Sequence, residues 1–288
     1  MKDFGSVTLS NGVEMPLLVQ GLPLILDFKD VSKKDFMELI LYSIRSGVRA
    51  FDTSREYGKS ETYIGCTLQR ALKEGLVRRQ DLFITSKIGN AEQYKGQIEA
   101  YVDHSLRTMK LDYLDLMLLH WPTPDYYLQN WGKLEKVYRS GKVRAIGIAN
   151  CLERHLAAIE QAGFETQPHV VQFEYHPFRT VPSLVAYCKG RGMQIQAYSA
   201  LCLMIPMVVE NALLKELALK YGRSIPQIML RWVIQQQIAP IFRTYKMKNL
   251  KSNLELDSFL LEEEDMRRIS ALNINYKYHP ESLNCAGF

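Results

Sequence analysis

Short apolar runs alternate with helical patterns along most of the chain, and this alternation is the feature that most limits its fold. We predict eight strands, each a few residues long and mainly apolar. Continuous apolar runs of this length are typical of strands buried on both faces, as in a parallel sheet. The predicted strands cover residues 17–21, 48–53, 82–87, 114–120, 144–150, 169–174, 194–199 and 238–243.

Helical patterns lie between these runs. Ser32 and Asp35 form a capping box, after which apolar residues recur on one helical face. Before the first strand, Asn11-Gly12 separates two short β-prone runs, which predicts a hairpin. Further helices are predicted at 60–74, 92–109, 130–139, 152–162, 181–190, 211–221, 225–236 and 262–272.

Eight strands alternating with helices over 288 residues predict an α/β protein. We expect a (β/α)8 TIM barrel with an N-terminal β-hairpin and extra C-terminal helices, formed by residues 1–288 as a single domain. The alternative is an open doubly wound sheet, which would be expected to carry G-x-G-x-x-G after its first strand. That motif does not follow the first predicted strand, and no linker rich in Pro or Ser divides the chain.

Composition and charge exclude several classes of function. The net charge is +5, from 36 basic and 31 acidic residues, which is too mild to indicate a nucleic-acid or membrane partner. Residues 1–15 lack the apolar run of a signal peptide, and no apolar stretch approaches the ~18 residues of a membrane span. The cysteines are odd in number and scattered, so we expect reduced thiols, no zinc site and a cytoplasmic protein. They are Cys66, Cys151, Cys188, Cys202 and Cys285.

Polar residues stand at the ends of the predicted strands. In a barrel of this kind the active site lies at the carboxyl ends of the strands. Nearly every strand would therefore bring a polar or ionisable group to one rim. These residues are Gly21, Asp52, Lys87, His120, Asn150, Gln172 with Glu174, Tyr198 with Ser199, and Arg243 with Thr244.

Four residues near this rim suggest proton transfer to a carbonyl. A phenol such as Tyr57 is a poor acid, with a free pKa near ~10, and a nearby ammonium such as Lys87 would stabilise its phenolate. Asp52 could hold the ammonium in place, and His120 could orient a carbonyl oxygen. Taken singly, the aspartate is also typical of a cap, the lysine of a solvated rim and the histidine of a structural contact.

In several long motifs, which occur in the same order, the chain resembles the aldo-keto reductase family. The segment after His120 is short, as in the compact microbial members of that family. The resemblance covers essentially the whole chain. The matching segments are "NGVEMPLL", "FDTSREYGKSE", "ITSK", "LDYLDLMLLHWP", "GKVRAIGIAN" and "VVQFEYHP".

The resemblance implies NADP(H) bound across the rim and hydride transfer from its nicotinamide to a carbonyl carbon. It implies Tyr57 as general acid, Lys87 and Asp52 as its electrostatic partners, and His120 as the group that orients the carbonyl. Asn150 and Gln172 would bind the carboxamide, and Tyr198 would stack on the nicotinamide ring. The remaining cofactor residues that it implies are Gly21, Ser199, Arg243, Thr244 and Asn253, with Trp121 in the substrate pocket.

Some positions depart from the family pattern. Ala149 replaces a serine before Asn150, which removes one hydrogen bond to the carboxamide, worth ~0.5–1.5 kcal/mol. Gly21 is followed by Leu22-Pro23 rather than by threonine. In the family a glycine-rich loop covers the pyrophosphate, and here "ALCLMIPMVVEN" at 200–211 replaces it. We expect this segment to line a hydrophobic substrate pocket or, alternatively, to pack against a partner.

The basic run "IFRTYKMKNLKSNL" at 241–254 would hold the adenosine end of the cofactor. Arg243 takes the place of the family's lysine and can bind a phosphate bidentately. Asn249 falls where a second arginine is expected, and Lys246 or Lys248 could supply the missing charge. We expect NADP(H) to be preferred over NAD(H).

The sequence therefore predicts an NAD(P)H-dependent enzyme of broad aldehyde and ketone specificity. We expect it to act on small carbonyl substrates as a monomer without a metal. One alternative is a non-catalytic NADP(H)-binding regulatory or interaction protein of the same fold. A second is a phosphate-binding barrel enzyme, such as an isomerase, which would not bind a nicotinamide cofactor.

Overall fold

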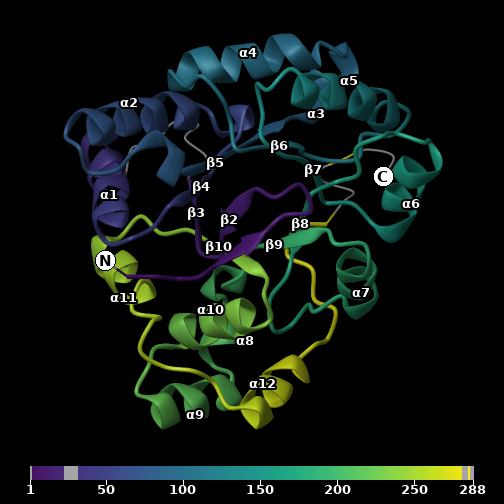
Figure 1. The fold of residues 1–288 in the computed structure, drawn as a ribbon. Helices are drawn as coiled ribbons and strands as arrows, with labels where there is room; N and C mark the ends of the chain where they lie inside the picture. Colours follow the sequence, from purple (N-terminus) through teal and green to yellow (C-terminus); the bar gives the residue numbers. More distant parts are fainter. Residues whose placement is uncertain (1, 23–31, 281–284, 286–288) are drawn as a thin grey trace.

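The structure, a computed structural model, describes residues 2–22, 32–280 and 285. Its centre is a closed barrel of parallel strands in the order β10-β3-β4-β5-β6-β7-β8-β9. Helices surround this barrel in Figure 1. The predicted fold class is confirmed, and Pro23 lies outside the described residues. The barrel strands are β3 Val19–Gly21, β4 Ala50–Asp52, β5 Phe83–Ile88, β6 Leu116–Leu119, β7 Ile146–Ala149, β8 Val170–Glu174, β9 Gln194–Tyr198 and β10 Ala239–Phe242.

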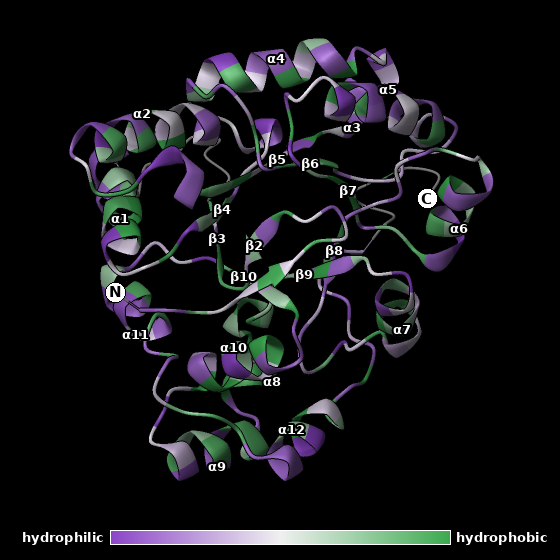
Figure 2. Ribbon diagram, viewed as in Figure 1, coloured by the Kyte–Doolittle hydropathy of each residue, from purple (hydrophilic) through white to green (hydrophobic). Residues whose placement is uncertain are grey.

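Burial on both faces explains the apolar strands. Almost every residue of β3–β8 and β10 is buried, because the barrel interior lies on one side and the helices on the other. The helices carry both hydrophobic and hydrophilic residues (Figure 2), as expected for elements with one buried face. They are α1 Lys33–Arg45, α2 Ser60–Lys73, α3 Asn90–Lys95, α4 Ile98–Met109, α5 Tyr127–Arg139, α6 Glu153–Gln161, α7 Pro182–Gly190, α8 Pro206–Val209, α9 Ala212–Tyr221, α10 Ile225–Gln235, α11 Met247–Asn253 and α12 Glu263–Ser270.

The predicted hairpin is present as β1 Ser6–Thr8 and β2 Glu14–Pro16. Its turn uses Gly12 at φ +82°, a conformation that favours glycine. The hairpin lies at the end of the barrel where the strands begin: Asn11 Nδ2 donates to Arg144 O at 2.9 Å, and Met15 is fully buried.

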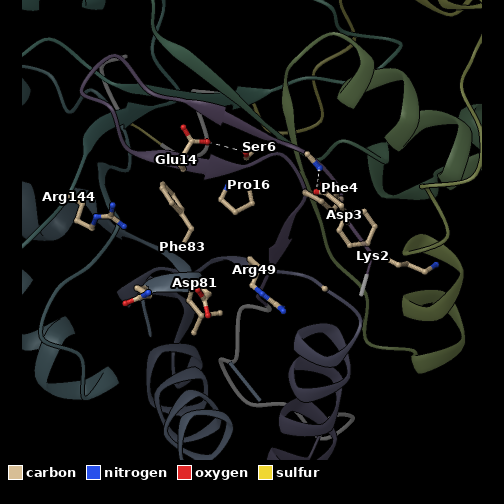
Figure 3. A pocket seen from close by; sticks show the side chains of 15 residues that line it. Lys2, Asp3, Phe4, Ser6, Glu14, Pro16, Arg49, Asp81, Phe83 and Arg144 are labelled. Carbon is tan, nitrogen blue, oxygen red and sulfur yellow. Dashed lines mark hydrogen bonds between the residues drawn. The ribbon is translucent and has the colours of Figure 1, made fainter. Parts of the chain in front are cut away.

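A cavity of about 430 Å³ lies between the hairpin and the amino ends of the strands. In Figure 3 the side chains of Glu14 and Pro16 face those of Arg49 and Phe83 across it. The residues of the predicted catalytic set do not line this cavity, since they belong to the opposite, carboxyl end of the barrel.

Two local predictions need correction, and one segment holds a helix that was not predicted. The helix predicted over 92–109 is two helices, because Gly96 adopts a left-handed conformation that ends α3. The predicted loop at 200–211 contains the 3₁₀ turn η3 Cys202–Met204 and the short helix α8, which begins at Pro206. The basic run at 241–254 forms α11 after β10, where Leu250 and Leu254 are buried one helical turn apart. Two further 3₁₀ turns are η1 Arg55–Tyr57 and η2 Arg79–Asp81.

Candidate active site

A cavity of about 560 Å³ opens at the carboxyl ends of the barrel strands. Most residues that the sequence placed on this rim line it together. They are Gly21, Asp52, Tyr57, His120, Trp121, Asn150, Gln172, Tyr198, Ser199 and Arg243.

Lys87 lies buried under this cavity and joins two of its lining residues. Its Nζ is 2.5 Å from Asp52 Oδ1, donates to Thr53 O at 2.9 Å, and lies 5.0 Å from the centre of the Tyr57 ring. Burial lowers the pKa of Lys87, but its interactions with Asp52 and with Tyr57 outweigh this effect, so the net shift is upward. The lysine is therefore an ammonium at neutral pH.

Burial raises the pKa of the Tyr57 phenol. Lys87 opposes this shift, Asp52 adds to it, and the net pKa stays above the ordinary value of 10. The phenol is accordingly protonated at neutral pH and stands next to a cation that would stabilise its conjugate base. Such a pair can donate a proton to an oxygen bound in the cavity.

His120 follows β6 and is held at its backbone and at its ring. Its N–H donates to Ile88 O at 2.9 Å, and its carbonyl accepts from Asn150 Nδ2 at 2.9 Å. Its Nδ1 lies 2.5 Å from Glu56 Oε2, and its ring centre is 6.0 Å from that of Tyr57. The imidazole and the phenol therefore face the same region of the cavity.

The amide side chains of the site are held by two groups of hydrogen bonds. Gln172 Nε2 donates to Asp52 Oδ2 and to Gln196 Oε1, each at 2.9 Å. Tyr198 Oη donates to Asn150 Oδ1 at 2.6 Å. Asn150 itself has a left-handed backbone, with φ +59°, which asparagine tolerates better than most residues. These hydrogen bonds fix the amides and the Tyr198 ring at the cavity wall.

Three other residues predicted to bind the cofactor also have structural contacts within the fold. Gly21 does line it, but a Cβ there would come within 2.8 Å of Ile241 Cγ2, so packing alone requires glycine. Thr244 Oγ1 accepts the N–H of Lys246 at 3.2 Å at the start of α11. Asn253 is buried on α11. Arg243, by contrast, is an exposed side chain at the cavity edge.

Several residues that line the cavity were not predicted from the sequence. Glu56 directly precedes Tyr57 in "FDTSREYG", and Asn90 follows shortly after Lys87. This nearness to predicted site residues could have indicated both of them. Leu201 and Leu203 come from the apolar 200–211 segment, which agrees with the expectation that it lines a pocket.

His279 also lines the cavity, and no local sequence pattern indicated it. It lies against Tyr198, with ring centres 5.8 Å apart. Glu174 holds its segment by accepting the N–H groups of Tyr278 and His279, at 2.6 and 2.9 Å. Burial raises the pKa of Glu174, but His176 and these N–H groups outweigh it and lower the net value, so the anchor is a carboxylate.

The donor set fits a nicotinamide dinucleotide better than a metal. An aromatic face, three amides and an exposed guanidinium share the cavity. In the described ranges there is no group of three or more His, Cys, Asp or Glu side chains placed to hold a metal ion. Nor does any described helix have the length and apolarity to cross a membrane.

The structure thus combines a closed parallel barrel with a tyrosine, a lysine, an aspartate and a histidine grouped at its carboxyl end. The sequence profile of the Aldo/keto reductase family matches residues 25–203 and 207–274. Glyoxal reductase of Bacillus subtilis is 38% identical over 96% of this chain and 95% of its own length. The NAD(P)H-dependent D-xylose reductase of Scheffersomyces stipitis is 30% identical over 95% and 96%.

Solved structures of aldo-keto reductases have a similar fold over nearly the whole chain. The Bombyx mori aldo-keto reductase in complex with NADP superposes with a TM-score of 0.90 at 26% identity, covering 98% of this chain and 97% of that one. The chain belongs to the aldo/keto reductase family. It is an NAD(P)H-dependent oxidoreductase that reduces carbonyl groups of small molecules, and NADP(H) is its cofactor; a non-catalytic role is not favoured.

Proposed function

We propose that the cavity at the carboxyl end of the barrel is the active site, in which Tyr57 protonates the carbonyl oxygen of an aldehyde or ketone. The convergence of Tyr57, Lys87 and His120 on one cavity carries this proposal. When bound, NADPH supplies the hydride that the carbonyl carbon receives.

The chain's own residues supply position and charge. Tyr57 gives its O–H proton to the oxygen as negative charge develops there. The Lys87 ammonium stabilises the phenolate that remains, and Asp52 keeps the ammonium in place. His120 holds the carbonyl oxygen near the phenol.

The remaining wall residues would hold the cofactor. Asn150 and Gln172 offer amide groups to the carboxamide, and Tyr198 offers a ring face to the nicotinamide, with Ser199 beside it. Arg243 offers an exposed guanidinium to the adenosine 2′-phosphate, helped by Thr244 and Asn253 on the segment that follows β10. We expect NADP(H) to bind more tightly than NAD(H).

Trp121, Leu201 and Leu203 give the substrate side of the cavity an apolar wall. This wall favours aldehydes and ketones with apolar or aromatic bodies. We further propose that residues 1–288 act as one domain and as a cytoplasmic monomer that binds neither nucleic acid nor membrane.

NADPH oxidation with a panel of carbonyls tests the function. The panel holds glyoxal, since a relative carries that name, together with a simple aromatic aldehyde and a ketone. We expect turnover with NADPH that is faster for the aromatic aldehyde than for the ketone. NADPH binding without turnover across the panel would favour a non-catalytic regulatory protein. If neither NADPH nor NADH binds, a phosphate-binding barrel enzyme such as an isomerase would be favoured.

A further inference from the structure

Glu56 places a carboxylate beside the imidazole of the proposed active site, at the position directly before Tyr57. The 3₁₀ turn η1 sends these two neighbours to different partners: Glu56 Oε2 lies 2.5 Å from His120 Nδ1, and Tyr57 lies over Lys87. One short turn therefore fixes both the phenol and the imidazole.

The carboxylate of Glu56 is itself held in position. It lies against the backbone of Gly89, where a Cβ would come within 2.2 Å of Glu56 Oε1, and the backbone N–H of Asn90 donates to it. Burial raises the pKa of Glu56, but the hydrogen bond and charge of His120 outweigh it, and the net pKa is lowered. Glu56 is thus an anion at neutral pH.

An anion at Nδ1 decides which proton His120 can offer. A carboxylate only accepts hydrogen bonds, so Nδ1 must carry a proton. A neutral ring has one proton, and Nε2 is then an acceptor that cannot donate to a carbonyl. Only the doubly protonated ring can bind Glu56 and donate from Nε2 at the same time.

We propose that Glu56 is a positioning residue that makes carbonyl reduction depend on the cationic form of His120, which donates to the substrate oxygen from Nε2. This inference rests on the proposed function of the cavity. The charged and titratable groups at the cavity that the imidazole faces are Glu56 and Tyr57 on η1, Asp52 on β4, Lys87 on β5, Arg243 after β10 and His279. Of these, Glu56 is the one whose side chain bonds the ring.

Imidazole nitrogen NMR of the cofactor-free protein tests the tautomer directly. The His120 signals are assigned by their loss in His120→Gln. We expect the neutral ring of the wild type to carry its proton on Nδ1, and the neutral ring of Glu56→Gln to carry it partly on Nε2, because glutamine can also donate. The same tautomer in both proteins, or Nε2–H in the neutral wild type, would overturn the proposal.

The pH profile of kcat gives the second readout. In the wild type kcat should fall toward alkaline pH, whereas in Glu56→Gln kcat should vary less with pH and be about tenfold lower at the acidic end, because the charge-assisted hydrogen bond is lost. The NADPH Kd should not change. A kcat of Glu56→Gln that is lowered by the same factor at every pH would indicate a merely structural role and overturn the proposal.

Glu92→Gln is the matched control. Glu92 caps the N–H of Gly89 at 3.0 Å and pairs with Arg55 at 2.5 Å, so it is a neighbouring carboxylate that bonds elsewhere. Its variant should keep the wild-type pH profile; a profile like that of Glu56→Gln would contradict a specific role for Glu56. If the wild type reduces no carbonyl at all, the proposed function fails, and the NMR result still decides the tautomer.

Discussion

The ammonium of Lys87 lies 2.5 Å from the carboxylate of Asp52, and both side chains are buried beneath the candidate active site. Asp52 ends β4 and Lys87 lies in the adjacent strand β5, so the barrel register itself brings the pair together. A buried pair of this kind costs free energy to desolvate, and removing one partner leaves the other charge without compensation.

Lys87→Met should therefore damage both activity and stability. We expect kcat to fall about 10²–10⁴-fold, because the phenolate of Tyr57 loses its cation. The free energy of unfolding should fall by about 3–5 kcal/mol, because Asp52 is left buried and unpaired. Turnover and urea denaturation measure the two effects.

The double variant Asp52→Asn with Lys87→Met separates these effects. It should recover much of the stability without recovering activity, since neither buried position then holds an unpaired charge. Wild-type turnover in the double variant would contradict the electrostatic role of Lys87.

Arg243→Met tests the phosphate site. A charge-assisted hydrogen bond contributes about 1.5–3 kcal/mol, so the Kd for NADPH should rise about 10–100-fold. The Kd for NADH should stay nearly constant, because it lacks the 2′-phosphate. Fluorescence titration of both cofactors measures this, and equal weakening of the two would argue that Arg243 does not bind the 2′-phosphate.

The barrel and most residues at its carboxyl end could be predicted from the sequence. Strands buried on both faces give continuous apolar runs, and parallel strands bring their carboxyl ends to one rim. Asp52, Lys87 and His120 were found in this way.

What escaped prediction depends on contacts between distant segments or on a single backbone conformation. Gly96 splits one helical pattern because of its left-handed φ of +63°, which a periodic pattern does not reveal. His279 lies at the cavity in a segment whose backbone is bound by Glu174, 105 residues earlier. Glu56 could be read from its motif, but its bond to His120 depends on η1.

Glu174→Ala should loosen the segment that carries His279. Without the carboxylate, the N–H groups of Tyr278 and His279 lose their acceptor, so their amide hydrogens should exchange faster. We expect a larger rise in KM than loss in kcat, since the segment forms the cavity wall rather than the proton donor. Unchanged exchange at both amides would show that other contacts hold the segment.

His155 should make stability depend on pH. Its Nδ1 accepts the N–H of Leu152 at 3.1 Å at the start of α6, and burial together with Arg154 lowers its pKa to about 4. The unfolded chain binds this proton near pH ~6.5, before the folded protein does. The free energy of unfolding is therefore highest above pH ~6.5 and falls as pH drops toward 4.

His155→Gln removes this titration. The variant should be less sensitive to pH between 6.5 and 4, which urea denaturation at several pH values would measure. Equal slopes for wild type and variant would assign the acid sensitivity to other groups.

Single-turnover oxidation of bound NADPH, with an aromatic aldehyde and with Tyr57→Phe as the comparison, tests the central claim most directly. The phenylalanine keeps the ring over Lys87 but removes the proton donor. We predict that the rate falls at least about 10²-fold while the NADPH Kd stays within about a factor of three, because a general acid acts in the transition state rather than in cofactor binding. Wild-type rates in Tyr57→Phe would contradict the assignment of Tyr57 as the general acid.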